Sequence, residues 1–137
     1  MKYKLLLVLL ILLFLTGCVS TEREMMPIEK SLAKKYKAES FQLNFLTVSK
    51  KSFGNTKEKR KLLSVSIKNP KDIEKIFLDN SYSEKYSTTI ANYIVDSLGF
   101  ERLPFQPQEL QIDFFYESGF SLLSNESKKS YSFQLFK

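Results

Sequence analysis

The chain has 137 residues, 43% of them hydrophobic, and a formal net charge of +6, which is enough for one domain with a modest core. Lysine supplies nearly all of the positive charge, since the only arginines are Arg23, Arg60 and Arg102, and lysine is poorly suited to bidentate recognition of bases and phosphates. The chain contains no histidine, which excludes Ser-His-Asp and Cys-His nucleophile pairs, histidine general bases and histidine-based zinc sites.

The N-terminal segment has the organisation of an export signal. Lys2 and Lys4 precede an apolar run over residues 5–15, which has the length of a signal-peptide hydrophobic region. The run is shorter than the stretch of about 20 apolar residues that spans a bilayer. It ends in Leu15-Thr16-Gly17-Cys18, and this ending resembles the lipobox of bacterial lipoprotein precursors.

The resemblance implies cleavage before Cys18, a diacylglycerol group on the Cys18 thiol, and palmitate or another acyl chain on the new amino terminus. Residues 1–17 are then a signal peptide, residues 18–27 a lipidated tether, and residues 28–137 a single domain. Because Cys18 is the only cysteine, its lipidation leaves no thiol for a disulfide, for catalysis or for a metal.

The residue after the cysteine is Val19 and not Asp. The sorting pattern of bacterial lipoproteins therefore implies the outer membrane in a two-membrane bacterium. In a single-membrane bacterium it implies the outer leaflet of the cell membrane. In both cases we expect the domain to face the extracytoplasmic side.

The domain begins with a predicted helix over residues 28–38. Ile28, Leu32 and Tyr36 recur at helical spacing, and Pro27 suits the first turn. The lysines around this stripe lie close in sequence to the anchor. We interpret them as a solvated helix face or, alternatively, as contacts to anionic lipid headgroups: Lys30, Lys34, Lys35 and Lys37.

Two alternating runs then predict a β-hairpin. Apolar and polar residues alternate over residues 41–48 and again over 63–67. The polar and highly charged stretch 50–61 between them reads as a long connecting loop.

Two helices are predicted next. Asn69 can cap the first one. The second, over residues 83–98, has Ser81 or Ser83 as its N-cap and Gly99 as its C-cap. Its apolar stripe needs a sheet to cover, and it consists of Tyr86, Ile90, Ala91, Ile94 and Leu98.

The last third of the chain predicts a loop over residues 100–108, a strand over 110–116, a short optional strand over 120–123 and a final strand over 131–135. Together these elements predict an α+β fold. We expect an antiparallel sheet of four to five strands in the order β-β-α-α-β-(β)-β. One or two helices pack on one face of it, and a short N-terminal helix precedes it.

Two weak catalytic patterns are present. Ser31 and Lys34 match the S-x-x-K pattern of penicillin-binding proteins and serine β-lactamases, but the S-x-N and K-T-G elements of that family are missing. Asp113 and Glu117 fall on one strand face about 13 Å apart, which is too far for a retaining glycosidase pair and loose for an inverting one. We favour solvated faces for both, and expect no catalytic residue, metal or cofactor.

A contact region for a protein partner is the better candidate. Aromatic residues gather in the C-terminal strands, and prolines stiffen the preceding loop. The candidate contact residues are Tyr116, Phe120, Pro104 and Pro107, although such aromatics also serve as core.

The leading hypothesis is a non-catalytic, lipid-anchored binding or structural protein of the cell envelope, with the membrane and an envelope protein as partners and no nucleic acid. One alternative is an envelope enzyme or accessory subunit using carboxylate, Ser or Lys chemistry, for which Asp113 or Glu109 would have to line a deep pocket. Another is an inhibitor- or immunity-type lipoprotein, which an unpaired strand edge beside the 50–61 loop would favour.

Overall fold

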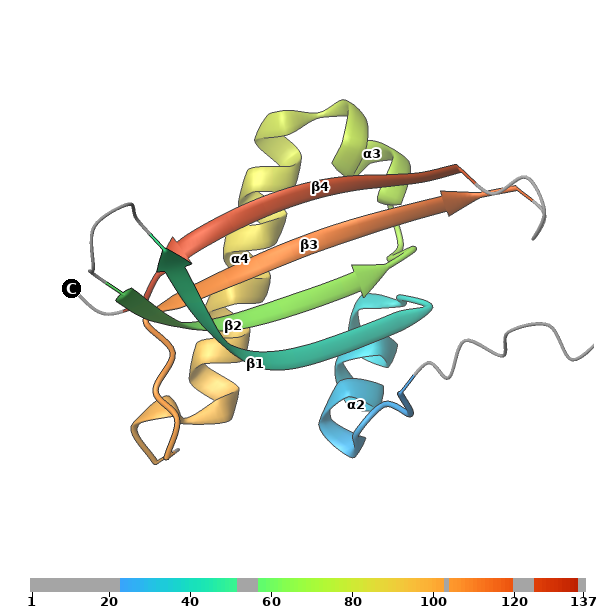
Figure 1. The fold of residues 1–137 in the computed structure, drawn as a ribbon. Helices are drawn as coiled ribbons and strands as arrows, with labels where there is room; N and C mark the ends of the chain where they lie inside the picture. The colour runs from blue at the N-terminus through green and yellow to red at the C-terminus, as the bar shows by residue number, and fades with distance from the viewer. Residues whose placement is uncertain (1–22, 52–56, 103, 120–124, 136–137) are drawn as a thin grey trace, which may run out of the picture.

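The computed structural model describes residues 23–51, 57–102, 104–119 and 125–135. Its elements are α2 (Pro27–Tyr36), β1 (Ser40–Lys51), β2 (Lys57–Lys68), α3 (Ile73–Leu78), α4 (Asn80–Leu98), the 3-10 helix η1 (Phe100–Arg102), β3 (Glu109–Ser118) and β4 (Asn125–Gln134). The strands form one sheet in the order β1-β2-β3-β4, and the α-helices lie on one side of it (Figure 1). The predicted α+β class and element order are confirmed, while the optional strand over 120–123 lies outside the described residues.

The predicted hairpin is confirmed and is longer than the apolar alternation indicated. β1 and β2 pair antiparallel from Ser40 opposite Lys68 to Lys51 opposite Lys57. The pairing therefore continues through charged residues that the sequence placed in a loop. Phe41 and Leu43 on β1 are buried, so the alternating pattern does identify the covered face of the strand.

The prediction of a fully antiparallel sheet is wrong, because β2 and β3 run parallel. Their register goes from Leu62 opposite Glu109 to Lys68 opposite Phe115. Between them α3 and α4 carry the chain back across the sheet to the end where β2 began (Figure 1). A helical crossover of this kind is how parallel strands are joined.

β4 begins earlier than predicted. It pairs antiparallel with β3 from Glu109 opposite Gln134 to Ser118 opposite Asn125. Residues 125–129, which lie outside the predicted strands, are therefore part of β4. Their polar sequence carries no strand signal, and the pairing with β3 overrides the local preference.

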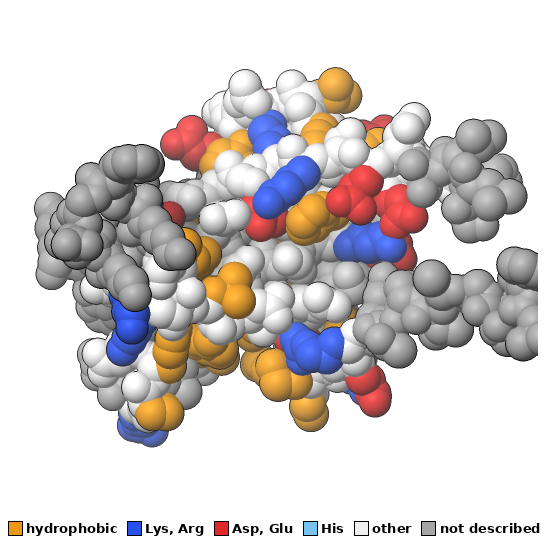
Figure 2. All heavy atoms as spheres, viewed as in Figure 1, with side chains coloured by type: hydrophobic (Ala, Val, Ile, Leu, Met, Phe, Trp, Pro, Cys, Tyr) orange, Lys and Arg blue, Asp and Glu red, His pale blue; other side chains and the backbone are white. Residues whose placement is uncertain are grey.

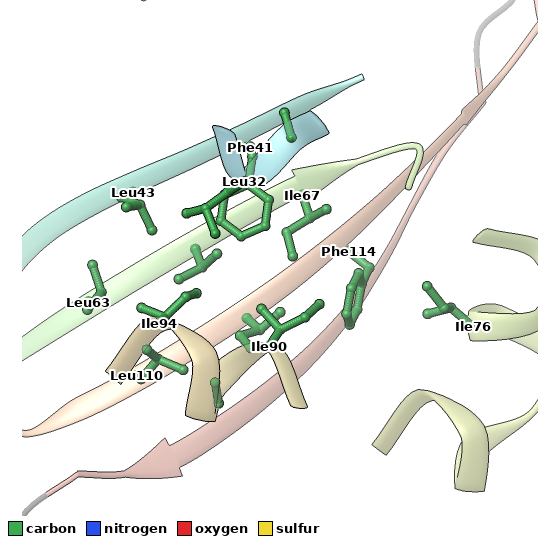
Figure 3. Packing of buried hydrophobic residues seen from close by; sticks show 14 of the residues in the cluster. Leu32, Phe41, Leu43, Leu63, Ile67, Ile76, Ile90, Ile94, Leu110 and Phe114 are labelled. Atoms are coloured by element: carbon green, nitrogen blue, oxygen red, sulfur yellow. The ribbon is translucent and has the colours of Figure 1, made fainter. Parts of the chain in front are cut away.

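The core lies between the helices and one face of the sheet. Ile90 and Ile94 of α4 point at the strands and are fully buried, and Ile76 of α3 closes the core beside Phe114 of β3 (Figure 3). Tyr86 continues the stripe, and burial raises the pKa of its hydroxyl to about 12, with smaller contributions from neighbouring tyrosines and Asp72. The predicted apolar stripe of α4 is thus confirmed as core.

Both ends of α4 are capped as predicted in kind, but the N-cap lies a few residues earlier than predicted. The helix begins at Asn80, and its N-cap is Asp79, whose side chain accepts a hydrogen bond from the Tyr82 N–H at 3.0 Å. Ser83, one of the two predicted caps, is instead buried inside the helix and is hydrogen-bonded to the Tyr131 hydroxyl. The predicted C-cap is confirmed, since Gly99 is left-handed with a φ of 54°.

Asn69 does not cap a helix as predicted, because α3 begins only at Ile73. It has a φ of +44° and turns the chain at the end of β2. Its side chain links two other segments: Oδ1 accepts from the Glu117 N–H at 3.0 Å, and Nδ2 donates to Glu39 at 2.8 Å. This hydrogen bond with Asn69 is the main factor lowering the pKa of Glu39.

We expect Asn69→Ala to destabilise the domain by about 2 kcal/mol, because it adds left-handed backbone strain to the loss of these hydrogen bonds. Asn69→Gly keeps the backbone geometry and loses only the bonds. Chemical denaturation should therefore give a lower free energy of unfolding for Asn69→Ala than for Asn69→Gly. Equal stability of the two would show that the backbone conformation costs nothing here.

A buried carboxylate holds the N-terminal segment against the sheet. Glu29 of α2 is fully buried and accepts hydrogen bonds from Arg23 at 2.5 Å, from the Met26 N–H at 2.6 Å and from the Leu43 N–H of β1 at 2.7 Å. Burial alone would raise the pKa of Glu29, but these bonds and the Arg23 charge outweigh it and lower the pKa. Glu29 thereby fixes both the start of α2 and the first half of the β1 edge.

Candidate functional site

One face of the sheet is left open by the helices, which all lie on the other side. No described helix covers it, and its middle consists of polar side chains, all of them uncharged except one aspartate (Figure 2). Charged groups gather toward the right-hand end of this view. We call this surface the open face. The central rows, read across the four strands, are Gln42, Ser66, Asp113 and Ser130, then Asn44, Ser64, Gln111 and Ser132.

Asp113 is the only charged side chain in these central rows, and only 4% of it is exposed. It accepts hydrogen bonds from Ser130 at 2.6 Å and from Gln111 at 2.9 and 3.0 Å, and Lys128 lies 3.2 Å away. The carboxylate is therefore saturated by fixed donors. Such an arrangement is suited to holding the strands together, since a general base needs a free lone pair within reach of a substrate proton.

Asp113 and Glu117 share one strand face, as their spacing predicted, but each is paired with a different lysine. Glu117 contacts Lys68 at 2.5 Å, and Lys68 also contacts Glu39 at 3.3 Å. The hydrogen bond with Glu117 is the main factor that raises the pKa of Lys68. The two carboxylates therefore do not converge on one reactive position.

A shallow hollow of about 320 Å³ lies at the charged end of the open face. It combines two basic groups, one acidic group and the half-buried ring of Phe115, which has Lys128 at 5.6 Å from its centre. It is lined by Arg23, Ser40, Gln42, Ser66, Lys68, Phe115 and Glu126.

The opposite end of the hairpin carries exposed apolar side chains. Phe45, Leu46 and Val48 of β1 are 40%, 44% and 46% exposed. Phe45 packs edge-on against Phe105 from the loop before β3, with ring centres 5.5 Å apart. A second hollow of about 400 Å³ lies beside this pair and is lined by Thr47, Lys59, Lys61, Gln106 and Gln108.

The four lysines considered for contact with lipid headgroups are all exposed on or just after α2. Lys30 pairs with Glu24 at 2.9 Å, and Lys35 lies over the ring of Tyr93 at 3.6 Å. Lys37 is the left-handed C-cap of the helix. Met26 and Ile28 add exposed apolar groups at the start of the same helix.

The structure does not bring the residues of the predicted contact region together. Pro107 is fully buried, which speaks against it as a contact residue, and Tyr116 is half-buried with its ring 6.0 Å from Phe77. Pro104 is exposed, but it precedes β3 whereas Tyr116 lies near its end. Most of the ten-residue strand, about 30 Å long, separates them. Phe120 and the lipidation residue Cys18 lie outside the described residues.

Ser31 and Lys34 of the S-x-x-K pattern are both exposed on α2, and neither lines any of the hollows described above. Glu109, the other carboxylate considered for an enzyme, lies 3.9 Å from Arg60. Among the described residues, no group of three His, Cys, Asp or Glu side chains is placed to hold a metal.

Two features of the site escaped the sequence analysis. Glu29 occupies the third position of α2, where acidic residues reach back to the N-cap backbone, but the Met26 cap does not provide the usual polar signal. The exposed edge of β1 was missed because alternation identifies strands without saying which of them lies at the border of the sheet.

Comparison of the chain with protein-family models, with curated proteins and with solved structures found no match. None of the described helices is both long and apolar enough to cross a membrane. The function must therefore be argued from the residues and the geometry of this chain.

Proposed function

We propose that this protein is a lipid-anchored protein of a bacterial cell envelope that binds a partner there and performs no catalysis. The observation that carries the proposal is the sequence Leu15-Thr16-Gly17-Cys18 at the end of an apolar run. An acyl anchor confines the domain to one surface, which raises its local concentration toward a partner on the same membrane. A modest intrinsic affinity is then sufficient.

The placement of Arg23 supports the anchoring step. Its contact with Glu29 ties the chain to the domain only five residues after Cys18, and five residues span at most about 17 Å. An anchor at Cys18 therefore keeps the start of α2 close to the lipid surface. The exposed lysines and apolar residues of α2 fit contact with anionic headgroups.

The uncovered surfaces of the sheet support the binding step. The open face offers polar groups with a hollow at one end. The β1 edge beside residues 50–61 offers backbone that no described strand pairs with, together with exposed apolar side chains. The edge specifically favours the inhibitor- or immunity-type form of the proposal, in which an envelope protein is captured by strand addition.

Cys18→Ala tests the anchor. We expect the wild-type chain to incorporate radiolabelled palmitate and to fractionate with membranes, whereas Cys18→Ala should carry no label and remain uncleaved or become soluble. Ser20→Ala, two residues further on, is the matched control and should behave as wild type. A Cys18→Ala protein that still takes up label and stays in the membrane fraction would contradict the proposal.

A further inference from the structure

The second half of β1 is a sheet edge that no described segment covers. β1 is the outermost strand, and Leu43 directs its N–H outward to Glu29. Outward N–H groups recur at every second residue of an edge strand, so those of Phe45 and Thr47 also point outward. None of the described residues accepts a hydrogen bond from them.

This half-edge lacks the usual protection against pairing with another chain. Residues 43–49 contain no charged residue and no proline, and Phe45, Leu46 and Val48 expose 40–46% of their surface. The other edge strand, β4, carries Glu126, Lys128 and Lys129, as protected edges do. The β4 edge is thus protected by charges and the second half of the β1 edge is not, which leaves the β1 edge able to pair with a further strand.

We propose that this half-edge binds an extended acidic segment of a partner protein, which adds to the sheet next to β1. The inference rests on the proposed partner-binding function and names the surface and the chemistry of the partner. Backbone hydrogen bonds to Phe45 and Thr47 supply sequence-independent affinity, and the flanking side chains supply specificity.

The two faces of the sheet differ in chemistry along the β1 edge, and this difference determines which side chains an added strand should carry on each face. On the helix side, Thr47 borders the 400 Å³ hollow with Lys59 and Lys61. On the open face, Leu46 and Val48 are exposed. Side chains of a strand alternate between faces, so the fitting segment alternates acidic residues, facing the lysines, with apolar residues, facing Leu46 and Val48.

Distance permits the charge contact. Lys61 lies directly opposite Thr47 on β2, and strands are spaced about 4.8 Å apart. A residue of the added strand next to Thr47 is therefore about 10 Å from the Lys61 backbone. Extended Lys and Glu side chains cover that span across the small Thr47 side chain.

A second copy of this chain fits the edge less well. β1 contains no acidic residue, so pairing β1 with β1 would leave Lys59 and Lys61 of each copy without a carboxylate from the added strand. Like charges at an interface oppose association.

The test uses the full-length lipoprotein in zwitterionic detergent micelles and a labelled synthetic peptide of alternating Glu and Val. Controls are the same peptide with Lys for Glu, and a peptide of equal composition with Glu and Val in pairs. We expect the alternating acidic peptide to bind at least about tenfold more tightly than either control. Its binding should slow the hydrogen exchange of the Phe45 and Thr47 amides.

Two variants separate the backbone from the charges. Thr47→Pro removes one outward N–H, and proline is tolerated where an edge N–H faces solvent. The double variant Lys59→Glu with Lys61→Glu keeps every backbone N–H of the edge and reverses the charge of the hollow from positive to negative. Each should weaken binding of the acidic peptide by about tenfold, and Asn92→Ala at an exposed position of α4 should leave binding unchanged.

Equal binding of the acidic and basic peptides, no binding of either, or binding insensitive to both variants would overturn the inference. Concentration-dependent self-association that Thr47→Pro abolishes would overturn it in favour of a second copy. If the charge variant weakens binding while Thr47→Pro fails to fold, amide protection at Phe45 alone decides. These outcomes leave the Cys18 test untouched, so failure of the edge and failure of the anchored function are distinguishable.

Discussion

Replacing Ile94 by Asp is expected to destabilise the domain by about 5 kcal/mol, because it removes a large buried side chain and places a carboxylate where nothing can pair with it. Ile94 is fully buried at the centre of the α4 stripe, facing the sheet (Figure 3). Domains of this size are stable by only about 5–15 kcal/mol in total. The variant should therefore be largely unfolded at 37 °C.

Asn92→Asp is the matched control, since it introduces the same side chain two residues away on an exposed position of α4. The melting temperature of this control, followed by circular dichroism, should lie within a few degrees of the wild-type value. A melting temperature of Ile94→Asp equal to that of Asn92→Asp would show that the stripe does not form the core.

The features predicted well from sequence are those that periodicity and caps determine locally. The Ile90 and Ile94 stripe, the Gly99 cap and the alternation around Phe41 and Leu43 all fall where expected. In each case an apolar period or a backbone preference acts within a few residues. No knowledge of the distant chain is needed.

The errors concern interactions between distant segments. Parallel pairing of β2 with β3 depends on where the α3–α4 crossover returns the chain, although the presence of that crossover was itself the available signal. Residues 125–129 become strand only because β3 offers them a partner. Asn69 turns the chain because Glu39 and Glu117 meet its side chain.

The candidate site was predicted less well than the fold. An aromatic or a proline in the sequence does not reveal its exposure, and Pro107 and Tyr116 prove buried or half-buried while Phe45, Leu46 and Val48 are exposed. Whether a strand is central or at an edge follows from the sheet order alone. Side-chain exposure and the position of each strand in the sheet therefore became visible only in the folded domain.

Replacing Glu29 by Gln is expected to destabilise the domain by about 2–3 kcal/mol at neutral pH. Three donors lose a charged acceptor, and the Leu43 N–H of the sheet edge is left with a weaker one. Arg23 is 44% exposed, so solvent screening reduces its share. Glu24→Gln is the control, because its carboxylate is exposed and the Lys30 pair should contribute little.

The difference between wild type and Glu29→Gln should also depend on pH. The pKa of Glu29 is lower in the folded protein than its ordinary value of 4.5, so in this range the unfolded chain binds more protons than the folded one and stability rises with pH. The contribution is complete above about pH 4.5 and is lost as the pH falls through the lowered value. Denaturation curves at pH 7 and at pH 3 should show the gap narrowing, and a constant gap would contradict an ionised Glu29.

The same variant connects stability with the sheet edge. Glu29 accepts the outward N–H of Leu43, so replacing its charged carboxylate by a weaker amide acceptor loosens the edge of β1 between Phe45 and α2. Hydrogen exchange at the Leu43 amide should therefore accelerate in Glu29→Gln, while exchange at the buried Val65 on β2 changes only with global stability. Parallel changes at the two amides would mean that Glu29 stabilises the whole domain without protecting this edge.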